Sequence, residues 1–111
     1  MTEFLDFLKH KFAYVAIGEF KPNKFEEAQQ LYEKAVSTYR HGFKGAYLLR
    51  EPGTDKGIAI IFWESREDME ANEHNEVYET ILKEMAHLFT KAPTTSFYEL
   101  CSEIHQDQEQ E

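Results

Sequence analysis

The chain of 111 residues is long enough for one domain with a hydrophobic core, yet small enough to gain stability from association. Its hydrophobic content of 41% and aromatic content of 14% are typical of a folded globular protein and exclude an intrinsically disordered one. The formal net charge of −9 argues against a protein that binds nucleic acid or anionic membranes, because such proteins usually carry clustered Lys and Arg.

The chain has a single cysteine, Cys101, so it cannot form an intrachain disulfide. A reducing compartment is the simplest interpretation. No secretory signal and no apolar run of membrane-spanning length is visible in the sequence. We therefore expect a cytoplasmic protein that has no membrane partner.

The leading segment, residues 2–12, is predicted to form a short amphipathic helix that Thr2 can cap. Its apolar side chains fall on one side at three- to four-residue spacing: Phe4, Leu5, Leu8 and Phe12. Such a stripe packs on the domain, on a partner or on a membrane surface. Lys9 and Lys11 provide little positive charge for a lipid surface, which favours a protein contact.

The next elements are predicted to be a strand, a helix and a second strand. Residues 13–20 are rich in β-forming side chains. Pro22-Asn23 ends that strand and opens a helix over 24–40, because Pro tolerates the first turn and Asn caps well. Gly42 ends the helix, and residues 43–51 form a strand that leads into a hairpin turn over 52–57.

The stretch 57–64 is apolar on both alternate faces, unlike a strand that has one face in water. It predicts a third strand that is covered on both sides. Ser65 caps a helix predicted over 65–89, with Asp68 three residues later in an arrangement near a capping box. Residues 94–102 predict a fourth strand, and the acidic segment 103–111 is expected to be disordered.

The element order β-α-β-β-α-β over residues 13–102 predicts an α+β, ferredoxin-like fold with a four-stranded antiparallel sheet. A leading extension, 1–12, and an acidic tail, 103–111, flank this domain. Right-handed crossovers place both helices on one face of the sheet. The first and third strands carry apolar residues on both faces, which would leave a large exposed patch. Packing two sheets face to face removes that patch, so we predict a homodimer.

Two stretches of the sequence carry a family resemblance. One is Val15-Ala16-Ile17-Gly18-Glu19-Phe20-Lys21-Pro22, and the other is Phe62-Trp63-Glu64-Ser65, followed by a predicted helix that contains His74. With these stretches the chain resembles the antibiotic biosynthesis monooxygenase-like domains of the dimeric α+β barrel superfamily. The resemblance covers roughly residues 13–101. It implies a cleft between the helices and the sheet of each subunit.

The resemblance also implies two kinds of chemistry. Enzymes of this family oxidise polyketide-like aromatic molecules without a separate cofactor, or they bind haem and degrade it. The haem-degrading type uses an Asn on the first strand, a Trp at the end of the third and a His on the second helix. Trp63 and His74 match this pattern, but residues 13–20 contain no Asn. We therefore predict no cofactor and keep haem as a third alternative.

His74 is the polar candidate for catalysis, because a histidine there can act as a general base or as a haem ligand. It can equally form a hydrogen bond at the rim of the core. Trp63 is a candidate wall of a ligand cavity, with a role in the core or the interface as the alternative. Four tyrosines either give the cleft a phenolic lining or serve core and dimer contacts: Tyr14, Tyr32, Tyr47 and Tyr78.

The sequence predicts no metal site, because the five histidines are scattered and none has metal-binding spacing. The leading hypothesis is a homodimeric monooxygenase-like protein that oxidises or binds a small apolar or aromatic molecule in its cleft. The alternative is a non-catalytic dimeric binding or stress-associated protein. A cavity of a few hundred Å³ with converging polar groups would favour the first, and a cleft filled by side chains the second.

Overall fold

A computed structural model describes residues 11–106 of the chain. It contains four strands and three helices: β1 (Phe12–Glu19), α2 (Phe25–Ser37), β2 (Phe43–Arg50), β3 (Lys56–Trp63), α3 (Arg66–Asn72), α4 (Glu76–Ala86) and β4 (Thr94–Glu99). The strands form one antiparallel sheet in the order β2-β3-β1-β4. This is the predicted ferredoxin-like plan.

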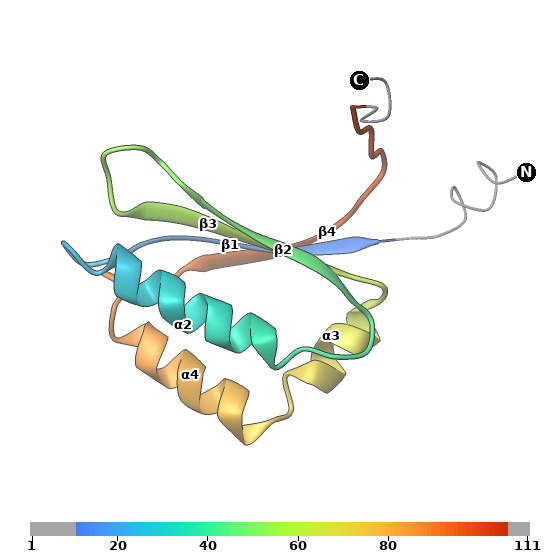
Figure 1. Ribbon diagram of the computed structural model, residues 1–111, viewed down its shortest axis with the longest axis horizontal. Coiled ribbons are helices and arrows are strands. Elements are labelled where there is room, and N and C mark those ends of the chain that lie inside the picture. The colour runs from blue at the N-terminus through green and yellow to red at the C-terminus, as the bar shows by residue number, and fades with distance from the viewer. Residues whose placement is uncertain (1–10, 107–111) are drawn as a thin grey trace, which may run out of the picture.

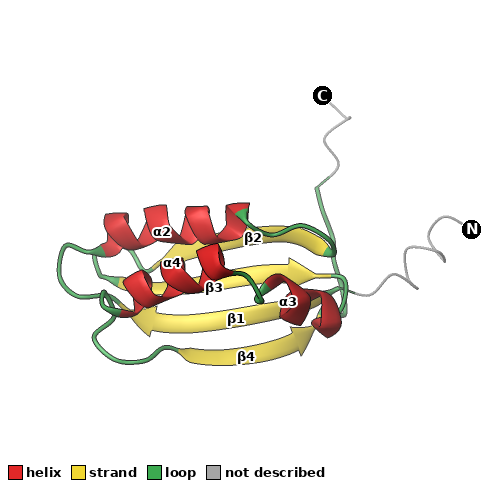
Figure 2. Ribbon diagram, turned by 90° about the horizontal axis from the view of Figure 1, so that it is seen from below, coloured by secondary structure: helices red, strands yellow, loops and turns green. Residues whose placement is uncertain are grey.

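Both long helices, α2 and α4, lie on the same side of the sheet, as the crossover rule predicts (Figure 1). The view from the helix side shows them running along the strands, with α3 beyond the start of α4 (Figure 2). The opposite face of the sheet carries no helix within residues 11–106. One sheet face therefore has an intramolecular cover and the other does not.

The first helix begins differently from the prediction. Asn23 does not cap it: this residue has a positive φ of 66°, and the N-cap is Lys24, which makes no side-chain capping hydrogen bond. Asn tolerates the left-handed region better than most residues, so it serves the turn before the helix. The helix ends at Ser37 rather than near Arg40. Gly42, with φ of 85°, still takes the left-handed conformation before β2.

The single helix predicted over residues 65–89 is wrong, because the chain forms two helices there. Ser65 caps α3 as predicted, and its side chain accepts the backbone N–H of Asp68 at 3.0 Å. That helix ends at Asn72, and Asn75 caps α4 by accepting the N–H of Tyr78 at 2.9 Å. A second local cap therefore restarts the helix in a new direction.

The ends of the described chain also refine the prediction. Phe12, assigned by sequence to the leading helix, is the first residue of β1, and residues 2–10 of that helix lie outside the described part. The last strand stops at Glu99 rather than at Ser102, so Cys101 lies beyond it and is exposed. Residues 103–106 have no regular structure and the rest of the tail, 107–111, is outside the described part. Within residues 11–106, no helix has the length and apolar character needed to cross a membrane.

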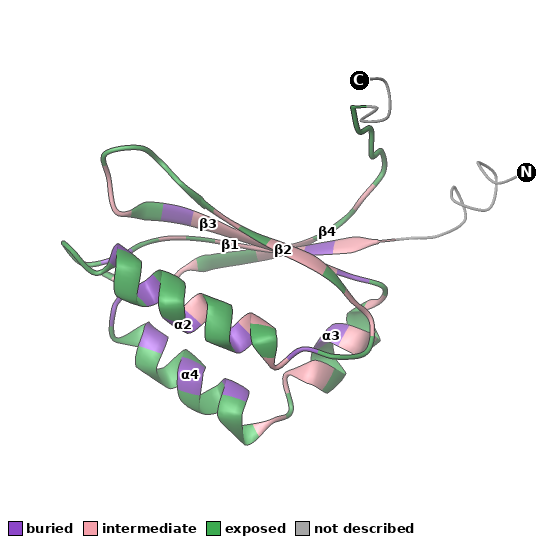
Figure 3. Ribbon diagram, in the orientation of Figure 1, coloured by how far each residue is buried: buried purple, intermediate pink, exposed green. Residues whose placement is uncertain are grey.

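The core lies between the helices and the inner face of the sheet. Figure 3 shows buried positions recurring along α2 and α4 between exposed ones. Every second residue of β1 and β3 points into this layer, and the residues between them point to the bare outer face. Several outer-face side chains are about half exposed in a single chain: Ile17 (51%), Tyr47 (58%), Leu49 (48%) and Tyr98 (56%).

Candidate functional site

A cavity of about 480 Å³ lies between α2, α4 and the inner face of the sheet. Its floor is made of small residues that face each other across the two central strands: Ala16 pairs with Ala59, and Gly18 pairs with Gly57. Alanines of the helices form much of the roof, including Ala28 and Ala35. Small side chains in the middle of both layers therefore leave the space that the cavity occupies.

Phenylalanines gather at the glycine end of the cavity. Phe20 stacks on Phe89 with ring centroids 4.5 Å apart and meets the edge of Phe25 at 5.4 Å. A Cβ on Gly18 would lie 2.7 Å from Phe89, and a Cβ on Gly57 would lie 3.1 Å from Phe25. The two glycines are therefore needed so that these rings can approach the sheet.

Tyrosines gather at the opposite end of the cavity, where β1 begins and β4 ends. Tyr14, Tyr39 and Tyr78 all line it, and the Tyr39 and Tyr78 rings lie 5.6 Å apart. Burial raises the pKa of Tyr78 to about 12, although a hydrogen bond from Tyr39 opposes the shift. Burial likewise raises the pKa of Tyr14 and Tyr39. At neutral pH all three are uncharged phenols, and because Tyr39 donates to Tyr78, the hydroxyls of Tyr14 and Tyr78 remain as donors in an apolar space.

Tyr32 and Tyr47 occupy opposite faces of the sheet. Tyr32 lines the cavity, but its hydroxyl donates to the backbone carbonyl of Tyr47 at 2.9 Å, so that donor is already used. Burial raises the pKa of Tyr32 to about 12. Tyr47 points to the outer face, is 58% exposed and packs edge-on against Phe62. Of the four predicted tyrosines, Tyr47 is therefore the one that the structure separates from the cavity.

Trp63 lies in the core behind the tyrosine end and is not among the residues that line the cavity. It is 1% exposed and packs on Tyr39 and Phe43, with ring centroids 4.7 and 5.8 Å away. Its indole nitrogen has no hydrogen-bond partner. Trp63 therefore supports the cavity through Tyr39 rather than forming its wall.

His74 lies in the connection between α3 and α4, not within a helix, and it is exposed. The chain turns there because Asn75 starts a new helix. No histidine of the described chain lines the cavity. The histidine-ligated haem that the resemblance implies therefore does not fit this cavity.

Glu73 is the acidic residue beside the tyrosine end, and the sequence did not single it out. It is half-buried, and its charge contributes to the raised pKa of Tyr14, Tyr39 and Tyr78. Burial raises the pKa of Glu73 itself, with a smaller contribution from Glu70. The continuous helix predicted for this region concealed Glu73, because the break at residues 73–75 sets its position.

The sequence matches no protein-family model and, at a significant level, no curated protein sequence. Solved structures do share its fold. A mutant form of SnoaB, a cofactor-independent oxygenase from Streptomyces nogalater, has a TM-score of 0.71 and 15% identity, over 88% of this chain and 96% of that one. An antibiotic biosynthesis monooxygenase has a TM-score of 0.67 and 15% identity, over 78% and 94%. The structural neighbours are antibiotic biosynthesis monooxygenase-domain proteins.

The same fold also occurs without a named activity. A conserved protein from Methanosarcina mazei Go1 has a TM-score of 0.72 and 14% identity, over 81% of this chain and 92% of that one. The TM-scores establish the antibiotic biosynthesis monooxygenase-like fold. At identities of 14–15%, the shared fold does not establish a shared function.

Proposed function

We propose that this protein binds a small aromatic molecule in the cavity between its helices and its sheet. The observation that carries the proposal is an apolar space of about 480 Å³ with phenols at one end. Typical ligand sites have this size range and combine an apolar lining with few polar groups. A structural dimer would instead have this space filled by side chains.

The distribution of polar groups indicates which ligands fit. The middle and the phenylalanine end of the cavity offer mainly apolar and aromatic contacts, which suit flat rings, and Lys91 is the charged residue in the described lining. Tyr14 and Tyr78 offer hydroxyls at the other end, where Tyr39 donates its own hydrogen bond to Tyr78. A ring system with a hydroxyl or carbonyl at one end would satisfy both, so we infer that the ligand is a hydroxy- or keto-aromatic molecule.

We further propose that the bound molecule is oxidised by O₂ without a separate cofactor. The electrons would come from the electron-rich ring itself, once a proton has left it, so that one oxygen atom of O₂ becomes a ring carbonyl and the other leaves as water. A carboxylate with a raised pKa is a stronger base than an ordinary one, and Glu73 is such a group beside the tyrosines. Glu73 therefore takes the role of proton acceptor that the sequence proposed for His74, acting through the phenols.

Binding is tested with the cavity-filling variant Ala59→Leu. Trp63 is the only tryptophan and contacts Tyr39, so its fluorescence reports occupancy of the tyrosine end. Wild-type protein titrated with a naphthol or a hydroxyanthracene should show a saturable change. Ala59→Leu should weaken ligand affinity at least tenfold. Ala71→Leu, the same substitution on the exposed surface of α3, should leave the affinity unchanged. Equal affinity in all three proteins would refute the proposed cavity site.

Oxidation is tested separately by O₂ uptake with the same ligands. Glu73→Gln should lose O₂ uptake at least tenfold while keeping ligand affinity, and His74→Ala should retain both. If the wild type binds the ligand without O₂ uptake, the oxidation proposal fails and the protein is a non-catalytic binding protein, which is the alternative hypothesis. Loss of O₂ uptake in His74→Ala but not in Glu73→Gln would instead assign the role of general base to His74, as the sequence predicted.

We also propose that the functional unit is a homodimer joined through the outer face of the sheet. That face presents Ile17, Leu49 and Tyr47 to solvent in a single chain. It also carries Ile58 and Ile60 between them, on the same face of β3. An exposed apolar surface of this extent on a small domain is a typical subunit contact.

A further inference from the structure

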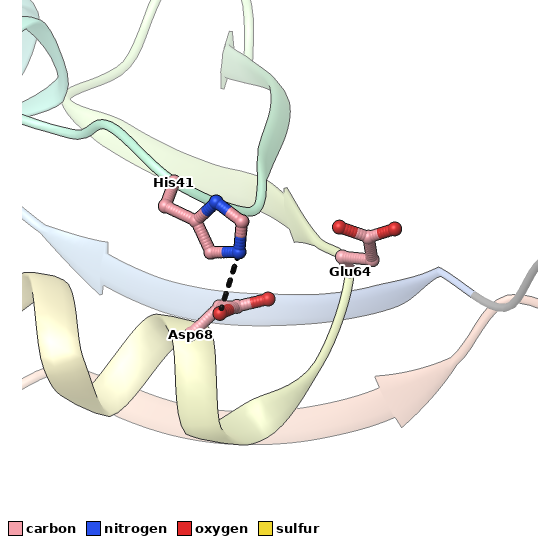
Figure 4. Close-up of side chains that lie close together, drawn as sticks. All are labelled: His41, Glu64 and Asp68. Atoms are coloured by element: carbon pink, nitrogen blue, oxygen red, sulfur yellow. Dashed lines mark ion pairs between the residues drawn. The ribbon is translucent and has the colours of Figure 1, made fainter.

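Three potential metal ligands meet at a point outside the cavity. His41 lies in the connection between α2 and β2, Glu64 directly follows β3, and Asp68 lies in the first turn of α3. Figure 4 shows the His41 imidazole facing the Asp68 carboxylate, with the Glu64 side chain beside them. We propose that His41, Glu64 and Asp68 form a binding site for a divalent first-row transition-metal ion.

The distances suit a site that closes around an ion. One ligand atom from each residue lies within 4.8 Å of the other two, and His41 Nε2 is 3.7 Å from Asp68 Oδ1. Bonds of about 2.0–2.2 Å to a central ion would bring the ligand atoms to roughly 3–3.5 Å from each other. His41 and Glu64 are exposed, so modest side-chain rotations achieve this without moving the backbone.

The backbone around the site is held in place by Asn72. Its side-chain oxygen accepts the N–H of Arg40 at 2.8 Å, and its amide donates to the His41 carbonyl at 2.9 Å. The N–H of Glu64 donates to the carbonyl of Gly42 at 2.7 Å. A Cβ on Gly42 would overlap the Asp68 side chain, so a glycine there lets the two segments meet. The three ligands are therefore presented by connected, fixed segments.

The chemistry of the donors indicates the class of ion. One imidazole nitrogen and two carboxylate oxygens suit Zn²⁺, Mn²⁺, Co²⁺ or Fe²⁺ better than Mg²⁺ or Ca²⁺, which prefer oxygen alone. Within residues 11–106, neither carboxylate forms an ion pair with a Lys or Arg. Both can therefore contribute their charge to a cation, and water would fill the remaining coordination positions.

The location gives the site a structural consequence. His41 is two residues after Tyr39, and Glu64 directly follows Trp63, which packs on Tyr39. A bound ion would join the segment before β2 to the segment after β3, at the tyrosine end of the cavity. Binding should therefore raise the thermal stability of this end of the domain, whatever the cavity contains.

The experiment titrates the full, untagged chain with ZnCl₂ by calorimetry. We expect one equivalent to bind saturably, and His41→Ala and Asp68→Asn each to weaken binding at least tenfold. Asn72→Ala should also weaken it, because groups that position ligands typically contribute 10–100-fold. His74→Ala and His105→Ala are the matched controls: each removes one exposed histidine outside the site and should leave the affinity unchanged.

A second measurement needs no variant. Paramagnetic Mn²⁺ at substoichiometric concentration should broaden the amide signals of residues 40–42 and 64–68 before those of the rest of the chain. The proposal is overturned if the wild type shows no saturable Zn²⁺ binding. It is equally overturned if folded His41→Ala binds as tightly as the wild type, or if Mn²⁺ broadens the Glu103–His105 pair and not the proposed site.

Discussion

The two faces of the sheet are built from the same strands but in opposite ways. On the helix side, the centres of β1 and β3 carry Ala16 opposite Ala59 and Gly18 opposite Gly57. On the outer side, the intervening positions carry Val15 opposite Ile60 and Ile17 opposite Ile58. Small residues thus face the layer that has a cover, and large apolar residues face the side that has none.

This contrast shows where each kind of function can reside. A well-packed domain places its bulky side chains in the core, because burying them stabilises the fold. Here the covered face leaves about 480 Å³ unfilled, at a cost in packing, while bulky residues are left on the surface. The inner face is therefore suited to a small ligand and the outer face to a second subunit.

The largest expected effect comes from a charge on the covered face. Ile61 is 6% exposed and points toward the helices, so Ile61→Glu would bury an unpaired carboxylate. A loss of about 4 kcal/mol or more of unfolding free energy is expected, which is enough to unfold many small domains. Circular dichroism during thermal denaturation measures it. A variant with wild-type stability would show that this position is not enclosed as described.

The same substitution on the outer face should act on assembly instead. Ile17 is 51% exposed in the single chain, so Ile17→Glu should leave the secondary structure intact and weaken dimerisation by at least 100-fold. Light scattering coupled to size-exclusion chromatography gives the mass of each form at micromolar concentration. A wild-type protein that is a stable monomer would contradict the assigned role of this face, as would an Ile17→Glu dimer of unchanged affinity.

A third effect, intermediate in size, concerns pH and is confined to the covered face. Burial raises the pKa of Tyr32 and Tyr78 to about 12, so the unfolded chain ionises first as pH rises above 10. The folded state then holds more protons than the unfolded state, and stability must fall between about pH 10 and 12. Tyr78→Phe should reduce the slope of Tm against pH in this range. An identical slope in both proteins would show that Tyr78 ionises freely in the folded state.

The order of the predicted elements was enough to predict the fold from sequence. Residues 57–64 correctly predicted a strand, β3, and the crossover rule correctly placed both long helices on one face of the sheet. The cavity was expected, and three of the four predicted tyrosines line it: Tyr14, Tyr32 and Tyr78. Hydrophobic period and turn residues carry this information because they act locally.

The remaining site residues depend on geometry that no local pattern encodes. Asn75 is a capping residue in the middle of an apolar helical pattern, and its capping hydrogen bond splits the predicted helix. That break moves His74 to the surface and places Glu73 beside the tyrosines. Tyr39 was missed as a site residue because the sequence placed it within the helix predicted over 24–40, whereas it follows the end of α2. His41, Glu64 and Asp68 meet only through the fold, so their sequence spacing gave no metal signal.

The smallest expected effect distinguishes two phenols on the covered face. Tyr78 and Tyr32 both line the cavity, but the Tyr32 hydroxyl already donates to the Tyr47 carbonyl, whereas Tyr78 accepts a hydrogen bond from Tyr39 and keeps its own proton for a ligand. Tyr78→Phe should therefore weaken binding of a naphthol by about 1 kcal/mol, or roughly fivefold, because one hydrogen bond to the ligand is lost. Tyr32→Phe should change naphthol affinity by less than about twofold, although it lowers stability by a similar amount through its lost backbone contact. Naphthalene, which has no hydroxyl, should bind Tyr78→Phe and wild type equally, as measured by Trp63 fluorescence. If naphthalene loses as much affinity as naphthol, Tyr78 shapes the cavity rather than recognising the ligand's oxygen, and the polar end must be assigned to Tyr14 alone.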